Sequence, residues 1–119
     1  MNSEIRRVAA ADLQAFIARA FSAIGISAAE AASIAELMTR ADVNGADGHG
    51  VFRLPQYIRR IKGGAVNIQP DIRVVRDAPG MALVDGDNGM GHLVMRFAAD
   101  KAIAKAKTAG TAWVGVKAS

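Results

Sequence analysis

Apolar residues recur at helical spacing through the first third of the chain. The run that opens at Asp12 and closes at Gly25 predicts an amphipathic helix. Ser27 and Glu30 have the spacing of a capping box, in which the two side chains satisfy free amides at a helix start, so a second helix is expected from there to about Asn44. The apolar positions on these stripes are Leu13, Phe16, Ile17, Ala20, Phe21 and Ile24, and then Ala31, Ile34, Ala35, Met38 and Ala41.

A third helix is expected within residues 51–62. Gly63 and Gly64 follow it and suit the left-handed turn that ends many helices. Pro55 is accepted in a first helical turn and disfavours helical geometry in the residue before it. The pattern therefore allows this helix to begin as late as Leu54.

Beyond Asn67 the pattern becomes that of short strands around one helix. Residues 72–76 and 81–84 are β-prone and flank a turn at 77–80, and a helix through about Ala109 precedes an apolar strand at 111–116. That helix carries Leu93, Phe97, Ala98, Ile103 and Ala106. The last strand is expected to be buried on both faces, as in parallel sheets.

These elements predict an α/β fold. A helical segment, residues 1–66, comes before the start of an α/β domain at 67–119. A buried parallel strand needs a neighbour on each side, and few are available here, so the sheet is expected to be incomplete in this chain. We therefore expect an N-terminal fragment of a longer protein.

Composition narrows the class of protein. The chain has 119 residues, a net charge of +4, 51% hydrophobic and 22% charged residues, which is typical of a globular domain. No run is long enough for a membrane span, and Met1–Arg7 lacks the apolar segment of a secretory signal. The absence of cysteine excludes disulfides and fits a cytoplasmic protein. Basic residues are spread along the chain, which argues against nucleic acid as a partner.

The candidate chemistry lies in one histidine and one arginine. His49 stands between two glycines, four residues before Arg53. Imidazole exchanges a proton near neutral pH, and a guanidinium group binds a carboxylate through a planar charged fork. The pair predicts a site for a small organic acid whose oxygen gains or loses a proton. A lone histidine is more often structural or solvated, and the anion beside Arg53 is either a substrate carboxylate or Asp47.

Two other patterns are considered as a metal site and as a dinucleotide-binding loop. Neither Asp42, Asp47 and His49 nor Asp85, Asp87 and His92 has the spacing of a metal-binding clip, so no metal is expected. Gly89 and Gly91 follow a strand and open a helix, as in a dinucleotide-binding loop, but Val94 occupies the place of the third glycine. Asp85 and Asp87 also put negative charge where a pyrophosphate would lie. The loop is therefore interpreted as a strand-to-helix turn, not as a Rossmann fingerprint.

The segment from Ala41 to Tyr57, ADVNGADGHGVFRLPQY, resembles the signature of the malate/L-lactate dehydrogenase family of the non-Rossmann type. That family includes sulfolactate and ureidoglycolate dehydrogenases, diketogulonate reductase and cyclic imino-acid reductases. Three further segments agree in order and spacing, namely residues 63–67, 83–91 and 102–110. The resemblance covers essentially the whole chain, and members of the family are considerably longer.

The resemblance implies a role for each residue of the pair. His49 would give a proton to the carbonyl or imine of the substrate and act as a base in the oxidative direction, while Arg53 would bind the substrate carboxylate. It also implies NAD or NADP as cofactor, a small carboxylate substrate and a homodimer when full length. Most cofactor contacts, and an aspartate that relays to the histidine, would lie beyond Ser119.

One departure from the family concerns Gly48. This position is usually serine, described as part of the relay, and glycine has no hydroxyl. Without the hydroxyl, either His49 is tuned differently or the site is weakened. A separate possibility is that Gly48 has a positive φ, which serine tolerates badly. The alternative to a dehydrogenase is a non-catalytic, truncated remnant or a self-associating interaction module with an exposed sheet edge. Residues 1–119 alone are expected to be inactive.

Overall fold

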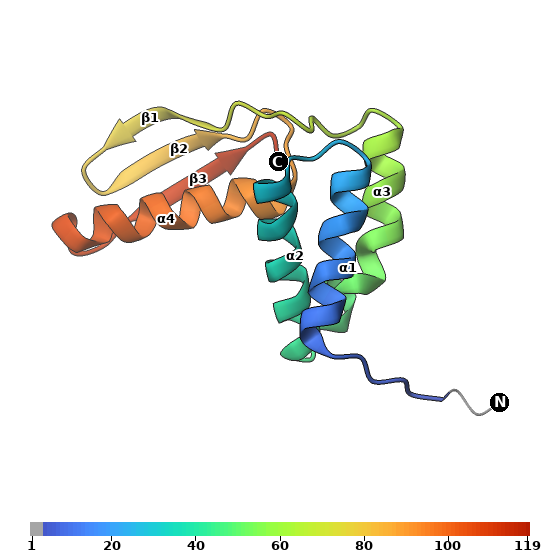
Figure 1. Cartoon of the computed structure of the whole chain (residues 1–119). Coiled ribbons are helices and arrows are strands. Elements are labelled where there is room, and N and C mark those ends of the chain that lie inside the picture. Colours follow the sequence, from blue (N-terminus) through green and yellow to red (C-terminus); the bar gives the residue numbers. More distant parts are fainter. Residues whose placement is uncertain (1–3) are drawn as a thin grey trace. The chain divides into compact units, whose positions relative to one another are not determined.

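A computed structural model describes residues 4–119. Met1, Asn2 and Ser3, the first part of the segment examined above for a secretory signal, lie outside the described residues. The chain divides into two compact units, one ending at Ile58 and the other comprising Arg59–Ser119 (Figure 1). None of the helices within residues 4–119 has the length and hydropathy needed to span a membrane.

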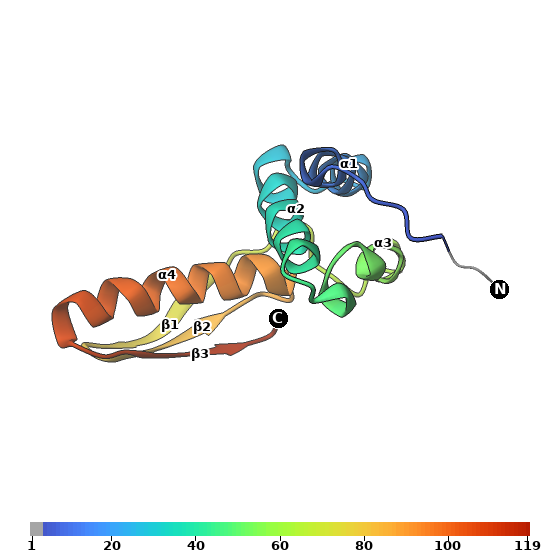
Figure 2. The same ribbon diagram turned by 90° about the horizontal axis from the view of Figure 1, so that it is seen from below.

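The first unit is built on two helices, α1 (Ala10–Ala23) and α2 (Ala28–Val43), which lie side by side in Figures 1 and 2. The predicted cap at Ser27 is confirmed, since its Oγ accepts the Glu30 amide at 3.3 Å. The glutamate carboxylate accepts the Ser27 hydroxyl at 3.0 Å. The four largest side chains with 0% exposure in this unit form the centre of its core, namely Ile17, Phe21, Ile34 and Met38.

Phe16 is a correction to the predicted core. It is 51% exposed, whereas its neighbour Ile17 is fully buried. Consecutive residues of a helix point about 100° apart, so the two cannot both face the centre of a contact with one partner helix. The apolar stripe read from the sequence was wider than the face that α2 covers.

Two short 3-10 turns, η1 (Asp47–His49) and η2 (Val51–Arg53), connect α2 to α3 (Leu54–Lys62). α3 begins at Leu54, which is the latest start that the prediction allowed on account of Pro55. The helix ends at Gly63 and Gly64, and Gly64 has a φ of +78°, the left-handed conformation predicted for this terminator.

The second unit is a three-stranded sheet in the order β1 (Arg73–Ala78), β2 (Met81–Asp85), β3 (Trp113–Lys117). The first pair is antiparallel and the second parallel, with α4 (Gly91–Ala109) as the crossover. Figure 2 shows α4 along one face of this sheet. Its buried core comprises Val84, Val94 and Ala98, with Ile72, Val74, Phe97, Val114 and Val116 packed against it. The predicted α/β class is confirmed.

The last strand differs from the prediction that it would be buried on both faces. Trp113 is 74% exposed, and the middle of β3 is only half-buried. Successive side chains of a strand point to opposite faces, and α4 covers one face only. Within residues 4–119 β3 also has a partner on one side only, namely β2.

Candidate functional site

The turn that carries His49 follows α2 directly. Gly45 has a φ of +80° and lets the chain leave the helix. The His49 amide then donates a hydrogen bond to the Ala46 carbonyl at 2.9 Å, which closes η1. The side chain of His49 is exposed. An exposed imidazole on a short hydrogen-bonded turn can exchange a proton with a bound molecule.

The guanidinium group of Arg53 is held beside the backbone of the same turn. Its Nε donates to the Gly48 carbonyl at 2.7 Å, and its Nη1 donates to Gln56 Oε1 at 2.9 Å. The Gly48 carbonyl belongs to the peptide group that leads into His49. The side chain of Arg53 is therefore linked to His49 through the backbone peptide group between Gly48 and His49. The remaining guanidinium N–H groups form no hydrogen bond within residues 4–119, so they can receive an external carboxylate.

Of the two anions considered for Arg53, Asp47 forms no ion pair with it in the described part of the chain. The first turn of α3 contains no acidic residue either. The positive end of the α3 dipole and the Arg53 charge thus lie together without a carboxylate from residues 4–119. Such an arrangement favours an anion supplied from outside this chain segment.

A contact that sequence reasoning missed involves Asp42 near the end of α2. Its Oδ2 accepts the Val51 amide at 2.8 Å. Its carboxylate also lies flat against Gly50, where a Cβ would approach Oδ1 to 2.0 Å. The sequence analysis considered Asp42 only as a metal ligand. Gln56, the partner of Arg53, was also missed. Its position three residues after Arg53, on the adjacent helical turn, could have indicated that the two side chains meet.

The structure decides one question about Gly48. This residue is not among the described glycines with positive φ, which are Gly25, Gly45, Gly64 and Gly110. A Cβ built on Gly48 meets no atom within 4 Å. The suggestion that a positive φ requires glycine here is therefore wrong.

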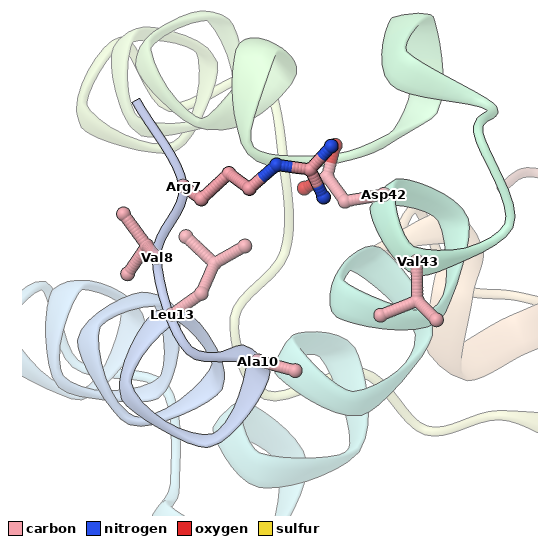
Figure 3. Close-up of a pocket in the computed structure, with 6 residues that line it drawn as sticks. All are labelled: Arg7, Val8, Ala10, Leu13, Asp42 and Val43. Atoms are coloured by element: carbon pink, nitrogen blue, oxygen red, sulfur yellow. The ribbon is translucent and has the colours of Figure 1, made fainter. Parts of the chain in front are cut away.

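A pocket of about 360 Å³ lies in the first unit beside this turn. Its walls come from the segment before α1, the start of α1 and the end of α2, and they are formed by Arg7, Val8, Ala10, Leu13, Asp42 and Val43. Figure 3 shows the side chain of Arg7 extended toward Asp42. Neither His49 nor Arg53 lines this pocket, so it is separate from the predicted pair.

The loop between β2 and α4 does not fit the phosphates of a dinucleotide. Three amides of the loop already have partners inside the protein: the Gly86 amide donates to the Lys117 carbonyl, the Asn88 amide to the Ala118 carbonyl, and the Asp87 amide to Asp85 Oδ1 at 2.9 Å. The Asp87 amide lowers the pKa of Asp85, and burial opposes this shift. The carboxylate therefore stays ionised and would repel a pyrophosphate. Val94, at the third glycine position, is a fully buried core residue.

No three His, Cys, Asp or Glu side chains gather into a metal-binding group within residues 4–119. His92, which was weighed as a ligand, lies in the first turn of α4, and burial lowers its pKa. A neutral imidazole at this place is consistent with packing in the fold.

A family model described as malate/L-lactate dehydrogenase matches residues 8–119. The chain belongs to this family. The resemblance read from the segment 41–57 is thus confirmed. This member is 41% identical over 98 residues to the malate dehydrogenase of Pyrococcus horikoshii, a match that covers 82% of this chain and 27% of the relative.

A second curated relative and a solved structure also resemble this chain. The L-sulfolactate dehydrogenase of Methanocaldococcus jannaschii is 41% identical over 95 residues, covering 80% of this chain and 27% of that protein. The solved structure of the P. horikoshii malate dehydrogenase superimposes with a TM-score of 0.91 and 38% identity, covering 95% of this chain and 32% of that one. This family member therefore has the fold of about one third of a dehydrogenase, and it spans less than a third of the length of the two curated relatives.

Proposed function

We propose that this chain supplies the substrate-binding part of a nicotinamide-dependent oxidoreductase that interconverts a 2-oxo acid and a 2-hydroxy acid, such as malate or lactate. The observation that carries the proposal is the hydrogen bond of 2.7 Å between Arg53 Nε and the Gly48 carbonyl. It holds the Arg53 guanidinium against the turn that carries His49, which supports a site in which Arg53 binds a carboxylate and His49 transfers a proton. Residues 1–66 would hold this site, and residues 67–119 would begin the α/β domain.

In the proposed reaction Arg53 binds the substrate carboxylate through its outer N–H groups. His49 donates its proton to the carbonyl oxygen as the 2-oxo acid becomes a 2-hydroxy acid. In the reverse direction neutral His49 accepts the hydroxyl proton. A 2-oxo acid carries its carboxylate on the carbon next to the carbonyl, which suits two groups held on consecutive turns.

The relatives support this substrate class, because malate and L-sulfolactate are both 2-hydroxy acids. The dehydrogenase names also support NAD or NADP as the cofactor, which would supply or accept the hydride. Since the Gly86, Asp87 and Asn88 amides of the loop before α4 bond within the protein, the cofactor contacts are assigned to no residue of this chain. A soluble cytoplasmic homodimer is the assembly proposed for the full-length enzyme.

Two substitutions in the full-length enzyme test the roles. His49→Ala should lower kcat by about 100- to 10,000-fold and leave cofactor affinity nearly unchanged, because one positioned proton donor is lost. Arg53→Lys should chiefly raise KM, because lysine keeps the charge and loses the fork. Arg60→Lys, an exposed position on α3, is the matched control and should change neither constant. Normal turnover in His49→Ala would refute the proton-donor role.

A second candidate, self-association through the sheet, is favoured by the edge of β3. Met81 and Trp113 are cross-strand partners that are 60% and 74% exposed, respectively. Such an edge can pair with another chain. The test is sedimentation of residues 1–119, in which Trp113→Lys should weaken association. A wild-type chain that stays monomeric at high concentration would rule this candidate out.

A further inference from the structure

The link between Asp42 and the turn that carries His49 has a consequence for catalysis. The turn's own hydrogen bonds are unequal: the His49 amide reaches the Ala46 carbonyl at 2.9 Å, but on the carboxyl-terminal side the Gly50 amide reaches the Asp47 carbonyl at only 3.4 Å. Backbone bonds in proteins are usually about 2.9–3.0 Å long. The bond from the Val51 amide to Asp42 is shorter, at 2.8 Å, and its acceptor is a carboxylate oxygen. The stronger restraint on this turn therefore comes from α2.

We propose that Asp42 is a positioning residue that sets the place of His49 relative to a bound substrate. The inference rests on the proposed function. Asp42 acts through the backbone, because it holds Val51 on the carboxyl-terminal side of His49 while the Ala46 carbonyl holds the His49 amide itself. The Gly50 carbonyl in turn accepts the Arg53 amide at 3.0 Å. One carboxylate thus restrains the segment between the proton donor and the carboxylate-binding arginine.

The fixed end of this restraint is α2. Met38 and Thr39, one turn before Asp42, are buried, so the helix end is anchored in the core of the first unit. Asp42 itself is half-buried. A carboxylate carried by a packed helix can hold a turn more firmly than one on a loop, because the helix loses little freedom when the contact forms.

The fit between Asp42 and Gly50 explains why residue 50 is glycine. A Cβ there would lie 2.0 to 2.3 Å from the carboxylate atoms of Asp42, far inside contact distance. At Gly48, two residues earlier, a Cβ meets nothing within 4 Å. The two glycines beside His49 therefore differ: a Cβ at residue 50 would displace the Asp42 carboxylate from its present position, and a Cβ at residue 48 would displace nothing.

The test uses the full-length enzyme and a double-mutant cycle. Asp42→Ala should lower kcat by about 10- to 100-fold, as expected for a displaced catalytic group, with cofactor affinity unchanged. Asp42→Asn keeps an acceptor oxygen for the Val51 amide and should retain kcat within roughly fivefold. In the His49→Ala background, Asp42→Ala should cause no further loss, because the residue acts through His49.

A purely structural role predicts otherwise. If Asp42 only stabilises the fold, Asp42→Ala would lower kcat by the same factor in the wild-type and His49→Ala backgrounds, because it would reduce the fraction of folded enzyme. That result would overturn the positioning role of Asp42 and leave the proposed function standing. An unchanged kcat in Asp42→Ala would do the same. If His49→Ala by itself keeps normal turnover, the proposed function fails and the inference falls with it.

A steric test supplies a second readout. Gly50→Ala should be less damaging to kcat when Asp42 is also alanine, because the colliding carboxylate is gone. Gly48→Ala, which adds a Cβ where no atom lies within 4 Å, should not lower the melting temperature. Equal damage from Gly50→Ala with and without the Asp42 carboxylate would overturn the proposed contact.

Discussion

Gly48→Ser adds the hydroxyl that the family resemblance led us to expect beside His49, and the structure gives its steric consequence directly. The backbone φ of Gly48 is outside the left-handed region, and a Cβ there has no neighbour within 4 Å. A side chain should therefore fit without movement of η1. Replacing glycine in a compatible conformation stabilises a protein by about 0.4–1 kcal/mol, because the unfolded chain loses freedom. We expect Gly48→Ser to raise stability by a similar amount.

The effect on rate comes from the hydroxyl. A serine beside His49 can orient the imidazole through one hydrogen bond, which contributes on the order of 1 kcal/mol. Since ~1.4 kcal/mol of barrier corresponds to a tenfold change, the full-length variant should turn over up to about tenfold faster. A shift of the lower limb in the pH–rate profile would show that the hydroxyl acts on the proton transfer of His49.

Gly48→Ala is the matched control, because it adds the Cβ without the hydroxyl. Urea unfolding of residues 1–119 should show similar stabilisation for alanine and serine, while kcat should rise for serine alone. A loss of stability in both variants would refute the steric reasoning. Equal rates in all three proteins would refute the role of the hydroxyl and mean that the site works without it.

Two further predictions concern the fold. Phe21→Ala removes a fully buried ring and should cost about 3–5 kcal/mol in urea unfolding, whereas Phe16→Ala, at a position 51% exposed, should cost less than about 1 kcal/mol. Equal costs would refute the assignment of the α1–α2 core. Burial lowers the pKa of His92 below its ordinary value of 6.5, so as the pH falls below 6.5 the unfolded chain binds a proton before the folded one does and stability declines. His92→Gln should reduce this decline, as measured by urea midpoints at about pH 7 and pH 5; the same decline in both proteins would contradict it.

Several helix ends could be predicted from the residues alone, and the pair His49 and Arg53 could be proposed from them. Ser27 and Gly64 mark helix ends through their own backbone and side-chain chemistry, and Pro55 allowed the start of α3 at Leu54. These signals act over a few residues, so they can be recognised without knowledge of the rest of the fold. The segment around His49 and Arg53 likewise carried the family resemblance in its residue order.

The faces that are covered and the groups that meet depend on how the helices and strands pack together. Phe16 and Trp113 are exposed because each lies away from the face that a neighbouring element covers, and periodicity alone does not say how wide that face is. The contact of Asp42 with Gly50 and Val51 joins a helix end to a turn eight and nine residues on, through a path that depends on Gly45 and the two 3-10 turns. Spacing in sequence cannot give that approach, because it is set by the direction in which the chain leaves α2.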